Sequence, residues 1–224
     1  MEVIVKLRHD STEIEEWRNL LLIYKFALDE INTKLKILNE EFQFVHQHNP
    51  IEHIKSRIKD PSSIKRKLQR KGLKMTIEKA TKHIHDIAGV RITCAFASDI
   101  YKIYDMVSCQ DDISILKVKD YLKEPKPNGY KSLHLLVEIP VFLTNRTENV
   151  KVEIQIRTIA MDFWASLEHK IYYKYDKAVP EYLIDELKEA AEMAQYLDHK
   201  MKRIHDEMMM YKVKEKLEKT RVII

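Results

Sequence analysis

The stretch Lys126-Pro127-Asn128-Gly129-Tyr130-Lys131-Ser132-Leu133-His134 joins a turn to a strand and holds one of only three glycines among 224 residues. An Asn-Gly pair favours a tight turn because glycine adopts backbone angles that strain other residues. Apolar residues at every second position after the turn predict a strand at 131–139. The junction combines a tyrosine ring, lysines and an imidazole, which suits stacking on a base and holding phosphates by charge.

The rest of the chain mixes predicted strands with predicted helices. Hydrophobic periodicity and capping signals predict helices at 11–45, 61–72, 76–85, 99–107, 159–175 and 181–220. Alternation predicts further strands at 51–60, 90–96, 113–118 and 150–157. Ser11 or Thr12 is expected to cap the first helix, Asp60 to cap the second ahead of Pro61, and Gly72 to end it. This pattern predicts an α+β or α/β core with helical flanks.

Length and composition allow one large domain over residues 1–224, or one domain with helical extensions; the predicted helices at 11–45 and 181–220 would then flank a core at 51–175. A hydrophobic content of 45% is enough for a core, while a net charge of +4 does not by itself indicate nucleic acid. Cys94 and Cys109 form neither a disulfide framework nor a zinc motif. Without a secretory signal or a membrane-length apolar run, the expected compartment is the reducing cytoplasm, with no membrane contact.

Four predicted strands each carry a polar face opposite an apolar one. The polar sets are Lys55, Arg57 and Lys59; Arg91 and Thr93; Ser132, His134 and Glu138; and Lys151, Glu153, Gln155 and Arg157. A single strand of this kind is more often a solvated outer face than a site. Four convergent sets, with Asp86 and the Gly129 turn at their ends, favour a site.

Asp86 and Glu153 supply two carboxylates to this face. Two carboxylates among cations suit a site in which one holds a divalent metal ion and the other accepts a proton. The chain has no P-loop, so phosphates must be held by side-chain cations, which are abundant at 61–75: Lys65, Arg66, Lys67, Arg70, Lys71 and Lys74. The alternatives are that Asp86 only caps a turn, that Tyr130 is a packed aromatic, and that the basic run is a solvated helix face.

Five segments together resemble the synthetase domain of the RelA/SpoT alarmone family, especially its stand-alone small alarmone synthetases. They are Arg57-x-Lys59-x-x-x-Ser63, Asp86-Ile87-Ala88-Gly89-Val90-Arg91, the Lys126 to His134 stretch, Glu153-Ile154-Gln155-Ile156-Arg157-Thr158, and Met161-Asp162-Phe163-Trp164-Ala165-Ser166-Leu167-Glu168-His169. Their order and spacing are specific, although no single one is decisive. The resemblance covers about 51–175, over half of the chain.

The resemblance implies an α+β, nucleotidyltransferase-like fold with a mixed β-sheet of about five strands. It also implies transfer of the β,γ-pyrophosphoryl group of ATP to the ribose 3′-hydroxyl of GDP or GTP, with Mg²⁺ as cofactor. For ATP, it assigns Arg57 and Arg91 to adenine and Lys59, Ser63 and Lys67 to the phosphates. For GDP or GTP, it assigns stacking to Tyr130, phosphate contacts to Lys126 and His134, loop shape to Asn128, and nearby places to Lys131, Gln155 and Asp162. Asp86 would bind the metal, and Glu153 would orient or deprotonate the hydroxyl and share the metal.

The C-terminal helix carries a heptad seam of apolar residues: Leu183, Leu187, Ala190, Ala194, Leu197, Met201, Ile204, Met208 and Tyr211. On packing grounds this seam fits either the 11–45 helix or another subunit. The resemblance favours the second, since small alarmone synthetases form homotetramers. It also implies a synthetase without hydrolase activity, because about fifty residues before Arg57 cannot house a hydrolase domain. A rival function is a nucleotide- or RNA-binding module without chemistry, so RNA stays open as a partner.

Overall fold

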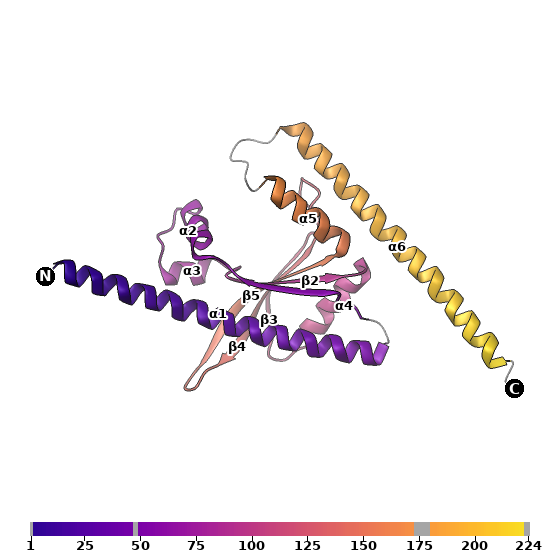
Figure 1. Cartoon of the computed structure of the whole chain (residues 1–224), viewed down its shortest axis with the longest axis horizontal. Coiled ribbons are helices and arrows are strands. Elements are labelled where there is room, and N and C mark those ends of the chain that lie inside the picture. The colour runs from indigo at the N-terminus through magenta and orange to yellow at the C-terminus, as the bar shows by residue number, and fades with distance from the viewer. Residues whose placement is uncertain (1, 47–48, 173–179, 222–224) are drawn as a thin grey trace.

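A five-stranded mixed sheet lies at the centre of the molecule (Figure 1). The computed structural model describes residues 2–46, 49–172 and 180–221. Their elements are α1 (Glu2–His46), β1 (His53–Ile58), α2 (Pro61–Arg70), α3 (Ile77–His83), β2 (Ala88–Cys94), α4 (Ala97–Ser108), β3 (Ser114–Asp120), β4 (Leu133–Phe142), β5 (Thr147–Thr158), α5 (Ile159–Tyr172) and α6 (Glu181–Arg221). Every predicted strand is present, so the sequence places the secondary structure correctly.

The strands are arranged in the order β1-β2-β5-β4-β3. β2 and β5 run parallel, and the other three neighbouring pairs are antiparallel. The parallel pair brings the segment after Asp86 next to the segment that contains Glu153, although 67 residues separate these two carboxylates in sequence (153 − 86). The prediction of an α+β fold with a mixed sheet of about five strands is confirmed.

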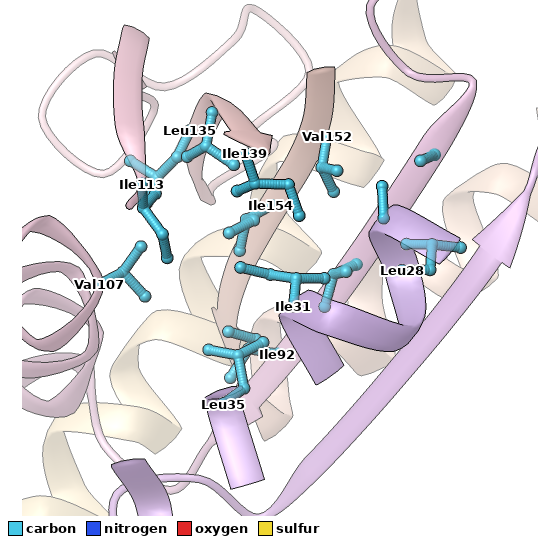
Figure 2. Packing of buried hydrophobic residues seen from close by; sticks show 14 of the residues in the cluster. Leu28, Ile31, Leu35, Ile92, Val107, Ile113, Leu135, Ile139, Val152 and Ile154 are labelled. Atoms are coloured by element: carbon cyan, nitrogen blue, oxygen red, sulfur yellow. The ribbon is translucent and has the colours of Figure 1, made fainter. Parts of the chain in front are cut away.

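The hydrophobic core lies between one face of the sheet and helices α1 and α4 (Figure 2). Leu28, Ile31 and Leu35 recur at helical spacing along α1 and are almost completely buried. They pack on the apolar side chains of the strands, among them Ile92 and Ile154. Burial of such side chains stabilises a fold by about 1.5–3 kcal/mol each. The helix expected as an N-terminal extension is therefore one wall of the core.

Helix boundaries test the capping predictions. The prediction that Ser11 or Thr12 caps the first helix is wrong, because α1 begins at Glu2 and no glycine or proline interrupts residues 2–10. At α2, the Asp60 side chain accepts a hydrogen bond from the Ser62 backbone N–H, and Pro61 is the first helical residue, as predicted. Gly72 has a φ of 67° and follows the cap residue Lys71, one position beyond its predicted place. The predicted end of the 159–175 helix lies outside the described residues.

Helix α6 leaves much of its seam uncovered. Leu187 and Ala194 pack near Trp164 of α5, but the seam residues beyond them are largely exposed: Leu197, Met201, Ile204, Met208 and Tyr211. α1 therefore does not cover the second half of the seam, which contradicts the intramolecular alternative there. Of the helices in the described ranges, none combines the length and apolar character needed to cross a membrane.

The turn before β4 is held against α6 at Gly129. Its φ is 85°, and a Cβ atom at this position would lie 2.6 Å from the Ala191 Cβ. We therefore expect Gly129→Ala to lower the free energy of unfolding by about 2–4 kcal/mol, because backbone strain and overlap add.

Thermal unfolding measures this effect, and Gly89→Ala is the matched control. Gly89 has no left-handed backbone, and an added Cβ there would contact no atom within 4 Å. The control should change stability by less than about 1 kcal/mol. Equal stability losses in the two variants would contradict the close packing of the turn on α6.

Candidate active site

Two rows of side chains cross all five strands on the sheet face opposite α1. Strand pairing aligns the first row as Lys55, Arg91, Gln155, His134 and Lys119. It aligns the second row as Arg57, Gly89, Glu153, Leu136 and Lys117. The predicted polar face is thus confirmed, and Gly89 leaves open space beside Glu153 near its centre.

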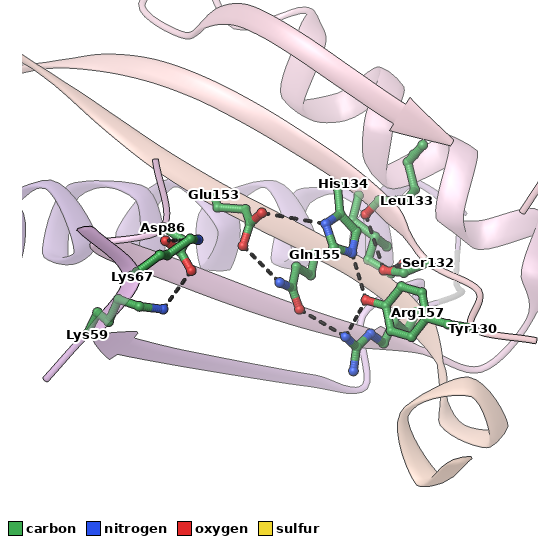
Figure 3. A network of polar contacts seen from close by, with 11 residues as sticks. Lys59, Lys67, Asp86, Tyr130, Ser132, Leu133, His134, Glu153, Gln155 and Arg157 are labelled. Carbon is green, nitrogen blue, oxygen red and sulfur yellow. Dashed lines mark hydrogen bonds and ion pairs between the residues drawn. The ribbon is translucent and has the colours of Figure 1, made fainter. Parts of the chain in front are cut away.

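Asp86 lies at the end of this face, just before β2, and binds two lysines (Figure 3). Lys59 Nζ lies 2.7 Å from its Oδ2 atom, and Lys67 Nζ lies 2.8 Å from its Oδ1 atom. Burial alone would raise the pKa of Asp86, but the hydrogen bonds and charges of both lysines outweigh burial and lower it. Asp86 is therefore a carboxylate that stays charged although it is mostly buried.

A basic cavity of about 410 Å³ opens beside α2. Its lining includes Arg57, Lys59, Ser63, Arg66, Lys67, Arg70 and His169. The cations come from the end of β1 and from one side of α2, whose i, i+3 and i+4 spacing places them together. This α2 cavity, as we name it, has the charge and size to hold a polyphosphate.

A second cavity of about 340 Å³ contains both candidate carboxylates. Asp86 and Glu153 line it together with His83, His85, His134, Lys67, Lys71, Lys117 and Lys119. Lys67 lines both cavities, so this central cavity adjoins the α2 cavity. The shared cavity brings together the metal-binding and proton-accepting carboxylates expected from the sequence.

Five side chains beside the central cavity form a closed circuit of hydrogen bonds and one ion pair: Tyr130, His134, Glu153, Gln155 and Arg157 (Figure 3). Arg157 donates to the Tyr130 hydroxyl at 2.6 Å and to Gln155 Oε1 at 3.0 Å. Gln155 donates to Glu153 Oε2 at 2.9 Å, and His134 Nδ1 lies 3.5 Å from Glu153 Oε1. The Tyr130 hydroxyl lies 2.7 Å from His134 Nε2, which closes the circuit.

The circuit determines the ionisation state of the Glu153 carboxyl group. Burial would raise the pKa of this carboxyl, but the hydrogen bond and charge of His134, followed by the hydrogen bond of Gln155, outweigh it and lower the pKa. Glu153 is therefore ionised at neutral pH and can accept a hydrogen bond from a hydroxyl. A carboxylate with a low pKa orients a hydroxyl well but is a weak base towards it.

Tyr130 is not the open stacking surface that its polar loop suggested. Its side chain packs with Trp164, Ala165 and Ala191, and only 8% of the residue is exposed. Lys126 Nζ lies 4.4 Å from the centre of the ring. The packed-aromatic alternative describes this arrangement better, because α5 and α6 fold over the loop. Stacking by Tyr130 stays a prediction, and it requires Lys126 to leave the ring.

Asn128 orders the loop that precedes β4. Its side-chain oxygen accepts a hydrogen bond from the Tyr130 backbone N–H at 3.2 Å, and its amide donates to Glu168 at 3.2 Å. This Asx turn gives Asn128 a structural part in the loop. Lys126 also reaches Tyr121, with its Nζ 5.1 Å from that ring.

Lys131 and Ser132 lie apart from the central cavity. Lys131 Nζ donates to Gln195 of α6, and burial lowers its pKa. Lys131 has the same strand parity as the inward-facing Leu133, and its place in the acceptor site stays a prediction. Ser132 is fully buried and donates to the Ile156 carbonyl, so it is also absent from the open face.

Asp162, at the start of α5, lies beside Arg91 of the first row. Asp162 Oδ1 is 3.2 Å from Arg91 Nη1 and 3.2 Å from Arg157 Nη1. Burial lowers the pKa of Arg91, and the nearby Arg157 charge adds to this effect. Asp162 thus holds two arginines of the face in place, one from each strand of the parallel pair.

Arg157, Lys117 and Lys119 join the site although no role was assigned to them from the sequence. Alternation already placed Arg157 on the polar face, so a signal for it existed. Lys117 and Lys119 sit on β3, an edge strand whose register shifts between Ile115 and Lys117. Because of this shift, simple alternation along the sequence does not predict which face of the sheet the two lysines occupy.

Asp86 and Glu153 are the carboxylates that could hold a divalent cation here. Among the described side chains, no group of three or more His, Cys, Asp or Glu residues is placed to bind a metal ion unaided. Mg²⁺ commonly binds through one or two carboxylates with the rest of its shell from phosphates and water. The two carboxylates of the central cavity therefore fit Mg²⁺ that arrives with a polyphosphate.

Comparison with known proteins places this site in a family. A family model described as the region found in RelA / SpoT proteins matches residues 56–178. GTP pyrophosphokinase YwaC from Bacillus subtilis (strain 168) is 60% identical over 198 residues, covering 88% of this chain and 94% of YwaC. Two crystal structures from the same species agree.

Small alarmone synthetase 2 from Bacillus subtilis superposes with a TM-score of 0.78 and 60% identity, covering 86% of this chain and 99% of that one. Small alarmone synthetase 1 from Bacillus subtilis, bound to its product pppGpp, superposes with a TM-score of 0.78 and 37% identity, covering 86% of this chain and 98% of that one. The sheet, the spacing of the five segments and these matches agree: the chain belongs to the RelA/SpoT family.

Proposed function

We propose that this protein is a GTP pyrophosphokinase that makes (p)ppGpp. It transfers the β,γ-pyrophosphoryl group of ATP to the ribose 3′-hydroxyl of GDP or GTP and releases AMP. One observation carries the proposal: Asp86 and Glu153 line one cavity that adjoins a basic, phosphate-sized cavity. The names of its relatives, GTP pyrophosphokinase and small alarmone synthetase, support the same activity.

ATP would bind along β1 and α2. Lys59, Ser63 and Lys67 line the α2 cavity and would hold the phosphates. Arg57 and Arg91 stand in adjacent rows of the face, on either side of the gap at Gly89, and would hold the adenine. When Lys59 and Lys67 bind phosphate, their ion pairs with Asp86 would weaken. The Asp86 carboxylate could then bind another cation.

Asp86 and Glu153 would hold Mg²⁺ together with the ATP phosphates. The bound ion would supply charge neutralisation for the transferred group. Each lysine binds one oxygen of Asp86, so the ion would compete with both lysines for this carboxylate. Exchange of Asp86 from lysines to the cation would thus accompany ATP binding.

GDP or GTP would bind on the other side of Glu153. Tyr130 would stack on the guanine after Lys126 moves from the ring to the acceptor's phosphates, which His134 would also contact. Glu153 would accept the hydrogen bond of the attacking 3′-hydroxyl and orient it. Its lowered pKa favours this orienting role over complete deprotonation.

The exposed seam of α6 supports assembly into homo-oligomers, which we propose to be tetramers. A cytoplasmic location is part of the same proposal, since the substrates ATP and GTP are cytoplasmic nucleotides. The exposed Met201, Ile204 and Met208 would be covered by neighbouring subunits. The proposal concerns synthetase activity, because the described residues form a five-stranded sheet with flanking helices and superpose on a small alarmone synthetase.

The function is tested by incubating the protein with Mg²⁺, ATP and radiolabelled GDP, and resolving the products by thin-layer chromatography. We expect the label to move to a guanosine carrying a 3′-pyrophosphate, with one AMP formed per product. Omission of Mg²⁺ should abolish the reaction.

The same experiment separates the rival functions. A nucleotide- or RNA-binding module would leave the labelled GDP unchanged. A nucleotidyltransferase would release pyrophosphate in place of AMP. Either result would refute pyrophosphoryl transfer.

A further inference from the structure

Arg157 is the most enclosed charged residue of the site. Only 4% of it is exposed, and its guanidinium lies 5.1 Å from the centre of the Tyr130 ring. A charge this deeply placed needs partners on several sides. Arg157 has them in Tyr130, Gln155 and Asp162. The planar fork of an arginine can satisfy all three at once, whereas a lysine ammonium is a single point of charge.

The contact with Tyr130 leads towards Glu153. Because a guanidinium only donates, the Tyr130 oxygen accepts from Arg157 at 2.6 Å. The same hydroxyl lies 2.7 Å from His134 Nε2. The other ring nitrogen of His134, Nδ1, lies 3.5 Å from Glu153 Oε1. A change at Arg157 would therefore reach Glu153 through Tyr130 and His134, and also through Gln155.

Arg157 also connects the two nucleotide sides of the site. Asp162 Oδ1 lies 3.2 Å from Nη1 of both Arg157 and Arg91. Arg91 belongs to the adenine side and Tyr130 to the guanine side of the proposed complex. Of these contacts, the one between Arg157 and the Tyr130 hydroxyl lies on the guanine side. Tyr130→Phe removes this contact but keeps the aromatic ring.

We propose that Arg157 is a positioning residue for the acceptor nucleotide: through the Tyr130 hydroxyl it sets the angle of the stacking ring and the position of His134 beside it. The inference rests on the proposed function for the identity of the acceptor. Arg157 contacts neither the reacting hydroxyl nor the phosphates in this role. It acts through its hydrogen bond to the Tyr130 hydroxyl, so the loss of either partner should have the same effect on GDP binding.

The test is a double-mutant cycle of Tyr130→Phe and Arg157→Gln in the full-length protein. The measured quantities are the equilibrium Kd of GDP, by isothermal titration calorimetry, and the KM values of GDP and ATP. Each single variant should raise the Kd and KM of GDP about tenfold, the effect of losing one hydrogen bond to a charged group. The KM of ATP should stay within about threefold in Tyr130→Phe, a variant that leaves the Asp162 contacts intact.

The double variant should bind GDP no more weakly than the weaker single variant, because both changes break the same contact. Arg157→Lys should stay as impaired as Arg157→Gln, since a lysine lacks the fork. Arg146→Gln is the control, because Arg146 is an exposed arginine paired with Glu148 beside β5.

Additive losses in the double variant, or full GDP affinity in Tyr130→Phe, would overturn the proposal. Recovery of GDP binding in Arg157→Lys would assign Arg157 a general charge-balancing role instead. If Arg157→Gln fails to fold, the Tyr130→Phe variant alone still decides between retained and lost GDP affinity. The binding measurement does not depend on turnover, so a wild-type protein that binds GDP without forming product refutes the proposed function and leaves this test intact.

Discussion

Glu153→Gln should lower kcat for pyrophosphoryl transfer by at least about a hundredfold while the protein stays folded. Glutamine has nearly the same shape but only one acceptor oxygen, so it can accept from His134 or from Gln155 but not from both. It also has no charge, and can neither orient the attacking hydroxyl as a charged acceptor nor help to hold Mg²⁺. The measurement is kcat at saturating ATP and GDP, with circular dichroism as the check on folding.

Glu148→Gln is the matched control for this experiment. Glu148 lies on the same strand, β5, but its partner is the exposed Arg146. The same chemical change there should alter kcat by less than about twofold, as for most surface substitutions. Wild-type turnover in Glu153→Gln would remove Glu153 from the chemistry.

Asp86→Asn should produce a loss of at least about a hundredfold in turnover, because it removes charge from the site proposed for Mg²⁺. Asparagine presents one acceptor oxygen where aspartate presents two, so it cannot offer Lys59 and Lys67 an oxygen each. Lys59 is mostly buried, and some loss of thermal stability should follow. Turnover and the unfolding temperature are measured on the same preparation.

A binding measurement distinguishes loss of the metal site from general damage. Without Mg²⁺, Asp86→Asn should bind ATP at least as tightly as the wild type, because the two lysines are released for the phosphates. The control is Asp112→Asn, which removes the partner of Lys34 on the surface. Loss of ATP affinity without Mg²⁺, together with a folded protein, would contradict the exchange of Asp86 between lysines and cation.

The polar face could be predicted because alternation is a local property of the chain. In β5, Glu153 and Gln155 alternate with Val152 and Ile154, and the structure buries the second pair. The same rule applies to Lys131, just before β4. Lys131 shares the parity of Leu133, so it could not face the same way as His134, and the structure places it against α6.

The parts that sequence reasoning missed depend on contacts between distant segments. Lys117 and Lys119 join the site only because β3 pairs with β4, and strand order is decided by tertiary packing. The burial of Tyr130 depends on α6, where Ala191 meets the Gly129 turn and the Leu187 carbonyl accepts from Trp164. The sequence pattern of the loop around Tyr130 says nothing about contacts with a helix that begins about fifty residues later, at Glu181.

The most direct test of a single face that binds both nucleotides is a crystal structure with a non-hydrolysable ATP analogue, GDP and Mg²⁺. It should show adenine between Arg57 and Arg91, guanine on Tyr130 with Lys126 displaced, and the cation bound by Asp86 and Glu153. The 3′-hydroxyl of GDP should lie about 3–3.5 Å from the β-phosphorus, in line for transfer. A complex in which either nucleotide lies off this face, or in which Glu153 contacts neither the hydroxyl nor the cation, would contradict it.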